Sequence, residues 1–296
     1  GKSIYLRPET AQGIYINYLL VQNSMRLKVP FGIAQIGKAF RNEIVARNFI
    51  FRTREFEQME MQYFVHPSED EKNMSFWKEK RVDFYTSELG INKDNLKFHQ
   101  HSEEALAHYA KDAFDIEYNF PFGWGEVEGI HNRTDFDLKE HEKLSGKNMM
   151  YFDQIKNEKY HPYIIETSTG LNRLFLMVLC EAYFEDEANN RTVLKLPFDL
   201  APNKAVICPL LKKDGLPEKA HNIFNIINAR YKCLYDEQGS IGKRYYRQDE
   251  AGTAFGITID HETLESDTVT IRKRDSMEQQ RVSSDKILQF ISDNKI

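Results

Sequence analysis

The chain has 296 residues, of which 41% are hydrophobic and 29% are charged, and its formal net charge is −5. This length predicts two domains with ordinary packed interiors. No apolar run approaches the roughly 18 residues that a membrane span needs, and a small acidic excess does not by itself indicate a nucleic-acid-binding protein. The three cysteines are isolated, which argues against a zinc ribbon or a disulfide framework and fits a reducing compartment: Cys180, Cys208 and Cys233.

The N-terminal stretch predicts a strand at residues 3–6, ended by Pro8, and then a helix capped by Thr10 that runs to about Leu27. Glu9 would lie at the turn between them. From the residues alone, Glu9 either favours the helix N-terminus electrostatically or faces a binding site.

Residues 32–63 predict two strands joined by a loop with several arginines, from Val45 to Arg54. Alternation places apolar side chains on one face of each strand, and polar side chains with one aromatic ring on the other. That second face carries Gln35, Arg41 and Glu43 on the first strand, and Phe56, Gln58 and Glu60 on the second. Guanidinium groups, a ring and carboxylates in one cavity suit a nucleoside triphosphate. A hairpin with a solvated charged face explains the same residues equally well.

Residues 68–117 predict more helix than strand. One helix opens at residues 68–71, with Trp77, Val82 and Tyr85 on its buried side, and a second lies near residues 102–111. Three histidines of this region lack the cysteine or carboxylate that would complete a zinc ligand set at helical spacing: His99, His101 and His108.

Two further segments carry charged residues at informative positions. Glu126 and Glu128 alternate on a predicted strand and would share a face, and carboxylates paired near phosphates usually hold Mg²⁺. Arg133 beyond them is, by residue type alone, either a surface arginine or a phosphate contact. In residues 162–183, Glu166 and Ser168 share a strand face, and an almost wholly apolar helix follows. Arg173 lies in the first turn of that helix, where a phosphate would be favoured.

The last hundred residues follow a Pro-bounded linker at residues 196–202. Predicted strands at 204–210, 255–260 and 268–273 alternate with helices at 217–234, 242–250 and 284–294, a pattern typical of an α/β layer domain. The second helix mixes cations with rings, which suits single-stranded RNA, although a solvated helix face is the commoner explanation: Lys243, Arg244, Tyr245, Tyr246 and Arg247.

Several of these strings together resemble one family. Phe40-Arg41-Asn42-Glu43, the loop and Arg54-Glu55-Phe56 resemble motif 2 of the class II aminoacyl-tRNA synthetases, most closely the dimeric glycyl-tRNA synthetase branch. Residues 162–180 resemble motif 3, except that Thr167 stands where the family often has proline. Residues 6–10 resemble the segment whose glutamate faces the amino-acid pocket, and residues 239–260 resemble the anticodon-binding domain of several class II synthetases.

The resemblance implies an α+β fold in two domains. Residues 1–198 would form the antiparallel catalytic sheet of class II synthetases, flanked by helices, with a helical insertion at about 66–118, and residues 199–296 a smaller α/β anticodon-binding domain. Motif 1 is not visible and the chain opens just before a motif, so we expect an N-terminal part to be absent from this sequence.

The implied activity is that of a glycine–tRNA ligase of protein synthesis. ATP and glycine would give glycyl-adenylate and pyrophosphate, and glycine would then pass to the 3′ end of tRNA(Gly). The family also implies Mg²⁺, a homodimer, a cytoplasmic location and no membrane partner. Glycine would be selected by steric exclusion, because a pocket crowded by Glu60, Glu166 and Ser168 refuses any Cβ.

Site residues are carried over from the motifs by position. Arg41, Arg173 and Glu60 would be catalytic, with Arg41 on the α-phosphate, Glu43 on the adenine amine, and Phe56 stacked on adenine. The ATP site would comprise Arg41, Asn42, Glu43, Phe51, Arg52, Thr53, Arg54, Glu55, Phe56, Glu126, Val127, Gly170, Leu171, Asn172 and Arg173. The glycine site would comprise Glu9, Phe56, Glu57, Gln58, Met59, Glu60, Glu166, Thr167, Ser168, Thr169 and Gly170. Glu126 would ligate the Mg²⁺ of ATP, and Arg133 would be a further phosphate contact.

Two other functions remain open. A synthetase for another amino acid could carry the same C-terminal domain, although the acidic Glu-Thr-Ser pocket argues against it. A catalytically inactive homologue could serve as a nucleic-acid-binding subunit, but such a chain should have lost the residues that contact ATP, and Arg41, Glu43, Phe56 and Arg173 are all present.

Overall fold

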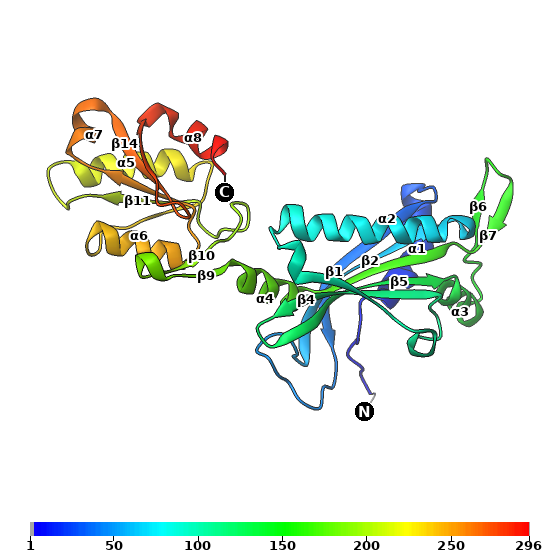
Figure 1. Cartoon of the computed structure of the whole chain (residues 1–296). Coiled ribbons are helices and arrows are strands. Elements are labelled where there is room, and N and C mark those ends of the chain that lie inside the picture. The colour runs from blue at the N-terminus through cyan, green and yellow to red at the C-terminus, as the bar shows by residue number, and fades with distance from the viewer. Residues whose placement is uncertain (1–2, 296) are drawn as a thin grey trace. The chain divides into compact units, whose positions relative to one another are not determined.

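The computed structural model describes residues 3–295, which form two compact units, Gly1–Met177 and Val178–Ile296 (Figure 1). The division falls earlier in the chain than the predicted boundary between residues 198 and 199. A short hairpin after Met177 accounts for the difference, because its side chains bond to the second unit. Within residues 3–295, no helix is both long enough and apolar enough to cross a membrane.

The first unit is built on a six-stranded antiparallel sheet, which confirms the predicted fold class. Its strand order is β1-β2-β8-β5-β4-β3. The strands are β1 Phe31–Phe40, β2 Glu55–Val65, β3 Leu96–Gln100, β4 Asp112–Phe120, β5 Gly123–Thr134 and β8 Tyr163–Gly170. The predicted hairpin of residues 32–63 is β1–β2, and motif 3 places β8 beside β2 at the centre of the sheet.

Two long helices cover opposite faces of this sheet. Helix α1, Ala11–Met25, lies on the face that carries Glu60, whereas α2, Asp70–Asp83, lies on the face that carries Tyr63, whose ring meets Trp77. The remaining elements are η1 Pro67–Glu69, the π-helix η2 Phe84–Glu88, η3 Lys93–Asn95, η4 Glu103–Ala105, α3 Phe136–Ser145, the hairpin β6 Tyr151–Asp153 and β7 Glu158–Tyr160, and α4 Leu171–Ala182.

One face of β2 changes steadily in character along the strand. Phe56 is partly exposed, Gln58 is 6% exposed, Glu60 is 2% exposed, and both Gln62 and Phe64 are fully buried. The deep end joins an aromatic core between α1 and the sheet, in which Phe64 packs against Tyr18 and Phe31. The polar residues of this face therefore run from solvent into the protein interior.

Some predictions for the first unit are wrong. Residues 3–9 form no strand, and Thr10 precedes α1 without capping it, because its hydroxyl donates to Glu60 instead. The second predicted helix, at 102–111, is replaced by turns around η4. The predicted insertion is helical in α2, but its later part supplies β3 and β4, because apolar residues at alternate positions pair across them: Leu96 with Tyr118 and Phe98 with Ile116.

The second unit is an α/β layer structure, as predicted. Its sheet has the order β12-β11-β13-β14-β15, parallel among the first three strands and antiparallel beyond. The strands are β11 Ala205–Pro209, β12 Cys233–Tyr235, β13 Phe255–Ile259, β14 Thr268–Lys273 and β15 Gln279–Ser283. The helices are α5 Leu216–Asn228, α6 Ile241–Glu250, α7 His261–Ser266 and, after η6 Ser284–Lys286, α8 Ile287–Asp293.

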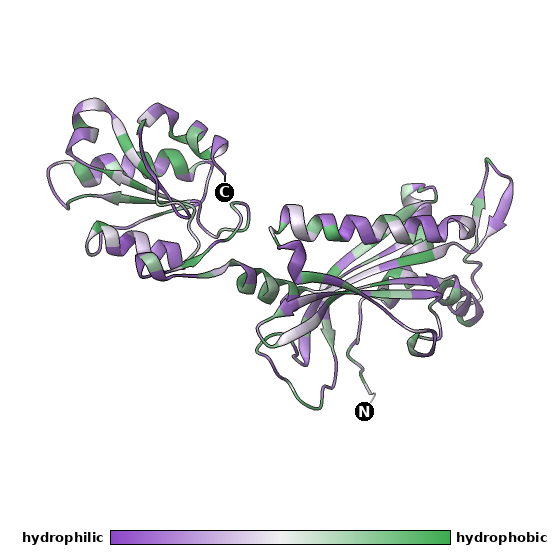
Figure 2. Cartoon of the chain, viewed as in Figure 1, coloured by the Kyte–Doolittle hydropathy of each residue, from purple (hydrophilic) through white to green (hydrophobic). Residues whose placement is uncertain are grey.

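The predictions for this unit missed two strands, β12 and β15, and the short helix α7, and they extended α5 too far. Green and purple alternate along α5 in Figure 2, because its apolar side chains face the sheet. The buried ones are Leu216, Ala220, Ile223 and Ile227. The hairpin that precedes this unit's sheet consists of β9 Tyr183–Asp186, η5 Glu187–Asn189 and β10 Arg191–Leu194.

Candidate active site

An open cleft lies on the first unit where the β1–β2 loop meets β5, the end of β8 and the start of α4. It encloses about 570 Å³, open solvent included. The lining residues are Arg41, Glu43, Ile50, Phe51, Arg52, Thr53, Phe56, Gln58, Glu126, Ser168, Gly170, Asn172 and Arg173. Most of the predicted ATP residues are therefore brought together in one place, and Ile50 is a member that sequence reasoning missed.

Guanidinium groups and rings are paired at the mouth of the cleft. The guanidinium carbon of Arg173 lies 4.4 Å from the centre of the Phe51 ring, and that of Arg41 lies 5.3 Å from the centre of the Phe56 ring. Phe51 is fixed in turn by edge-on contacts with Phe120 and Phe122. Planar cations beside aromatic faces form a slot that suits a flat, electron-rich group such as a purine base.

The two cleft arginines are anchored mainly by backbone oxygens. Arg173 donates to the carbonyls of Phe51 at 3.1 Å and Glu126 at 2.8 Å, with the Glu126 carboxylate 3.2 Å away, and Arg41 donates to the carbonyl of Pro8 at 3.2 Å. Among residues 3–295, no carboxylate lies within ion-pair distance of Arg41. Its charge is therefore available to an anionic ligand.

Beyond Gln58, the same face of the sheet leads to a buried pair of carboxyl groups. Gln62 bridges them, because its Nε2 lies 3.0 Å from Oε1 of Glu60 and 2.6 Å from Oε2 of Glu166. The Thr10 backbone N–H also donates to Glu60, at 3.1 Å, and Arg133 donates to Glu166 at 3.0 Å. Both acids are almost fully buried.

The pKa values of the two carboxyl groups are shifted in opposite directions. Burial, followed by the charge and hydrogen bond of Glu166, raises the pKa of Glu60 well above its ordinary value. Burial also acts to raise the pKa of Glu166, but the hydrogen bond from His131 and the charge of Arg133 outweigh it, so that this pKa is lowered. Glu60 is therefore the acid of the pair that binds a proton more readily, and release of that proton would let the pair accept a cation.

The predicted pairing of Glu126 with Glu128 is wrong. A β-bulge at Val127 inserts an extra residue opposite β4, since Glu128 pairs with Ile116 and Glu126 pairs with the next residue, Glu117. Glu126 therefore reaches the cleft, whereas Glu128 is buried on the opposite face, where it accepts hydrogen bonds from Arg81 at 2.6 Å and Tyr85 at 2.5 Å.

The phosphate contact predicted for Arg133 is not supported either. This arginine is 3% exposed, and its guanidinium donates to both oxygens of Asp137 and to Glu166. Its ring neighbour is Tyr109, 3.9 Å from the guanidinium carbon. Arg133 is thus part of the buried carboxylate network and is not a lining residue of the cleft.

Several other predicted residues border the cleft without lining it. Met59, Thr167 and Thr169 lie on the α2 face of the sheet, since they alternate with Gln58, Glu60 and Ser168, so that they offer this site backbone groups only. Glu57 donates its backbone N–H to the Asn172 side chain, and Glu55 pairs with Lys38. The others adjoin lining residues in the chain: Asn42, Arg54, Val127 and Leu171. Glu9 is partly buried just before α1.

Residues that complete the buried end went unnoticed in the sequence. Thr10, Tyr15, Gln62 and His131 all bond to the two acids or to their bridging amide. Gln62 could have been found, because it continues the alternation of Gln58 and Glu60. His131 could not, because its place opposite Glu166 depends on the register of β5 against β8.

The cations predicted to contact RNA in the second unit are largely used inside it. Arg244 is 4% exposed and donates to the carbonyls of Pro209 and Gly239, Arg247 is paired with Asp236, and Tyr245 is buried. Lys243, Tyr246 and the half-exposed Arg247 still reach solvent on α6. Fewer side chains of this helix are therefore available to contact RNA than the sequence suggested.

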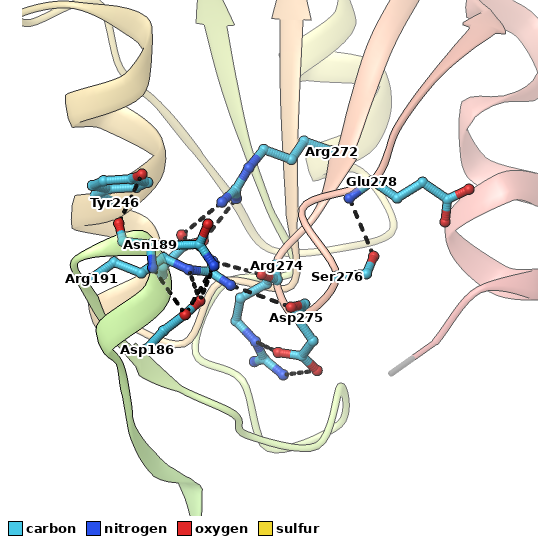
Figure 3. A network of polar contacts seen from close by, with 10 residues as sticks. Asp186, Asn189, Arg191, Tyr246, Arg272, Arg274, Asp275, Ser276 and Glu278 are labelled. Atoms are coloured by element: carbon cyan, nitrogen blue, oxygen red, sulfur yellow. Dashed lines mark hydrogen bonds and ion pairs between the residues drawn. The ribbon is translucent and has the colours of Figure 1, made fainter.

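A second arginine cluster fastens the β9–β10 hairpin to the rest of that unit (Figure 3). Arg191 of β10 lies 2.7 Å from Asp249 of α6 and 2.8 Å from Asp186 of β9, and Arg272 of β14 donates twice to Asp249 at 2.9 Å. Arg274, 1% exposed, donates to the carbonyls of Leu196 and Gly252. This network explains why the contacts assign the hairpin to the second unit.

Comparison with known proteins gives two family matches. Residues 1–183 match the tRNA synthetase class II core domain (G, H, P, S and T), and residues 204–294 match the anticodon binding domain. The chain is 55% identical over 296 residues to a protein of Treponema denticola named glycine–tRNA ligase, covering 97% of this chain and 65% of that one.

Proteins with the same name from Borrelia hermsii and Chlorobaculum tepidum are 54% and 52% identical, over 98% of this chain and 66% and 62% of their own lengths. The chain thus spans slightly less than two thirds of these relatives. With its antiparallel sheet, its cleft and these matches, the chain belongs to the class II tRNA synthetase core family and carries that family's anticodon-binding domain.

Proposed function

We propose that the protein is a glycine–tRNA ligase, which makes glycyl-adenylate and pyrophosphate from glycine and ATP and then transfers glycine to the 3′ end of tRNA(Gly). One observation carries the proposal. A single polar face runs from partly exposed guanidinium–ring pairs to a buried pair of carboxyl groups, and it does so in a chain about half identical to glycine–tRNA ligases.

The outer part of the cleft is suited to ATP. The Phe56 and Phe51 rings with their arginines would hold the adenine, and Glu43 lies on the lining where it can accept from an exocyclic amine. Arg41 has no carboxylate partner among the described residues, so it would neutralise the α-phosphate as charge moves onto the leaving pyrophosphate. Preorganised charges of this kind commonly dominate such chemistry.

The inner part is suited to a small amino acid. Glu60 and Glu166 would receive the ammonium group, and Ser168, whose hydroxyl accepts from Gln58 at 2.7 Å, would close the wall where any side chain must go. Glycine lacks a side chain to recognise, so the site must exclude larger amino acids sterically. The catalytic residues would therefore be Arg41, Arg173 and Glu60, and Glu9 would lie near the ammonium group of glycine.

Mg²⁺ fits this site as a partner of the triphosphate. Glu126 is half exposed at the cleft, whereas Glu128 accepts hydrogen bonds from Arg81 and Tyr85. The cleft therefore provides one carboxylate that could bind Mg²⁺. Residues 3–295 contain no group of three potential metal ligands. Mg²⁺ commonly binds through one carboxylate and substrate phosphates, and there it would neutralise phosphate charge.

The remaining assignments follow the family. The second unit would bind the anticodon arm of tRNA(Gly), and the protein would act as a cytoplasmic homodimer. A synthetase for another amino acid is disfavoured by the two acids that crowd the inner pocket. A catalytically inactive homologue is disfavoured because Arg41, Glu43, Phe56 and Arg173 line one cleft.

Pyrophosphate exchange with each of the twenty amino acids, on the full-length protein, tests the proposal. We expect exchange with glycine and at most traces with alanine or serine. If exchange depends on a different amino acid, that amino acid and not glycine is the substrate. A folded protein that binds ATP and shows no exchange with any amino acid would favour the inactive homologue.

A further inference from the structure

A histidine that the proposed chemistry does not use lies against the buried carboxyl pair. His131 of β5 sits directly opposite Glu166 of β8, and its Nδ1 is 2.9 Å from Oε1 of that acid. Because an ionised carboxylate can only accept, Nδ1 must carry the hydrogen and donate it. The imidazole thus stabilises the anionic form of Glu166.

The two acids of the pair have unequal partners. Glu166 receives Arg133, a permanent cation, and His131, whereas Glu60 receives neutral donors, the Thr10 N–H and hydroxyl and the Gln62 amide. A carboxylate buried without charged partners is costly, so Glu60 is the acid of the pair that takes up a proton. The protonated form can donate to the Thr10 hydroxyl, whose own hydrogen then rotates away. The lowered pKa of Glu166, against the effect of its burial, agrees with this geometry.

The imidazole of His131 occupies space that is free because residue 129 is a glycine. A Cβ at Gly129 would stand 3.1 Å from both Cε1 and Nε2 of His131, closer than ordinary packing allows. The absence of that Cβ leaves the space that the ring occupies while its Nδ1 contacts Glu166. The side chain of His131 is 21% exposed, so its outer edge reaches solvent while its inner edge meets a buried acid.

We propose that His131 is a positioning residue for the amino-acid site: it keeps Glu166 ionised in advance, so that an arriving ammonium group displaces the proton from Glu60 to solvent. This inference rests on the proposed function, in which the arriving cation is that of glycine. In each binding event one ammonium group enters and one proton leaves, so that the summed charge of the two acids and the bound ammonium group is unchanged.

Other charged and titratable groups also face the pair and its histidine. They are Tyr15 on α1, Asp115 on β4, Arg133 on β5, Asp137 on α3, and Glu9, His101 and Tyr109 in the connections. His101 is bonded to Asp115 at 2.8 Å, so it reaches Glu166 only indirectly. The measurements must therefore isolate the contribution of His131 by substitution.

Glycine binding measured by calorimetry in buffers of different ionisation heats would count the protons released. We expect about one proton per glycine near pH 7, and a glycine KM in pyrophosphate exchange that falls as pH rises. His131→Ala should raise that KM roughly tenfold, the typical effect of losing a hydrogen bond to a charged group, and move its acid limb to higher pH, with the KM for ATP unchanged. His131→Gln, which can still donate, should restore most of the loss.

A second variant leaves both partners in the chain and moves only the ring. Gly129→Ala should shift the imidazole by a few tenths of an ångström and give a weaker version of the same pH shift. Gly242→Ala, at a glycine with open space around it, is the matched control and should change nothing. His99→Gln, at a histidine whose side chain is 56% exposed, controls for loss of an imidazole.

The proposal is overturned if His131→Ala lowers exchange equally at every pH with proton release unchanged, because that would be a purely structural role. It is also overturned if wild-type protein binds glycine without releasing a proton. Absence of glycine-dependent exchange in the wild-type protein is a separate outcome, which would remove the proposed function and with it the substrate of this inference.

Discussion

The protein uses arginine in two contrasting ways, and the two regions can be compared directly. In the cleft, Arg41 and Arg173 donate to backbone carbonyls and lie beside aromatic rings, and carboxylates neutralise their charges only in part. In the second unit, Arg191 and Arg272 are buried and share the carboxylate of Asp249. A sequence shows the number of arginines in a region, whereas their partners decide whether the charge serves a ligand or the fold.

The sharpest test of the structural region is Asp249→Asn. This change leaves two buried guanidinium groups without their shared carboxylate, so we expect a loss of about 3–5 kcal/mol in the unfolding free energy of the second unit. Urea unfolding followed by a probe in that unit would measure it. Exposed Glu250→Gln on the same helix is the control, and glycine-dependent exchange should survive as long as the first unit is folded. An unchanged midpoint would show that the network does not hold this unit together.

The corresponding test of the cleft is Arg41→Ala. It removes a positive charge that would stabilise the negative charge developing in the transition state. The activation free energy should therefore rise by about 3–4 kcal/mol, so that the exchange rate falls a few hundredfold with no loss of stability. Arg47→Ala, in the same loop but outside the cleft lining, should keep normal exchange. Near-normal exchange in Arg41→Ala would mean that this arginine is not a phosphate contact.

A smaller effect is expected where the cleft meets its buried end. Ser168→Gly should make room for a methyl group and let alanine compete, reducing the preference for glycine over alanine by roughly 10-fold to 200-fold. Competition of the two amino acids in exchange measures it, with Ser75→Ala on α2 as the control. If alanine remains fully excluded, the steric wall lies elsewhere.

The smallest effect concerns the more exposed ion pair of the second unit. Arg281 donates to both oxygens of Asp260, and these hydrogen bonds lower the pKa of that carboxyl to about 2. A lowered pKa stabilises the fold above the unfolded value, near 4, and this contribution disappears as the pH falls toward 2.

Asp260→Asn retains an amide oxygen for the α7 cap but loses the ion pair. The free energy of unfolding of the variant should therefore be lower than that of the wild type by about 1 kcal/mol at pH 6, and the two should converge near pH 2. A difference that stays constant over this pH range would assign the stabilisation to packing or capping instead.

Much of the fold and the outer cleft could be predicted, because motif residues such as Arg41, Phe56 and Arg173 lie on elements with clear periodicity. The failures have local causes. Glu126 and Glu128 read as neighbours on one face until the bulge at Val127 separates them. The roles of Arg133 and Arg244 depend on carboxylates and carbonyls supplied by distant segments, and no spacing rule reveals such partners.

The graded burial along β2 has a consequence for how the site responds to its medium. Phe56 lies at a solvated rim, where mobile ions screen charges over about 10 Å at moderate ionic strength. Glu60 lies two side chains further along the same face and is 2% exposed, so mobile ions do not reach it. The same attraction is several times stronger at low permittivity than in water. Added salt should therefore loosen the hold on a polyanion at the rim while leaving the grip on a small cation inside nearly constant, so that one strand supports one adjustable contact and one fixed contact.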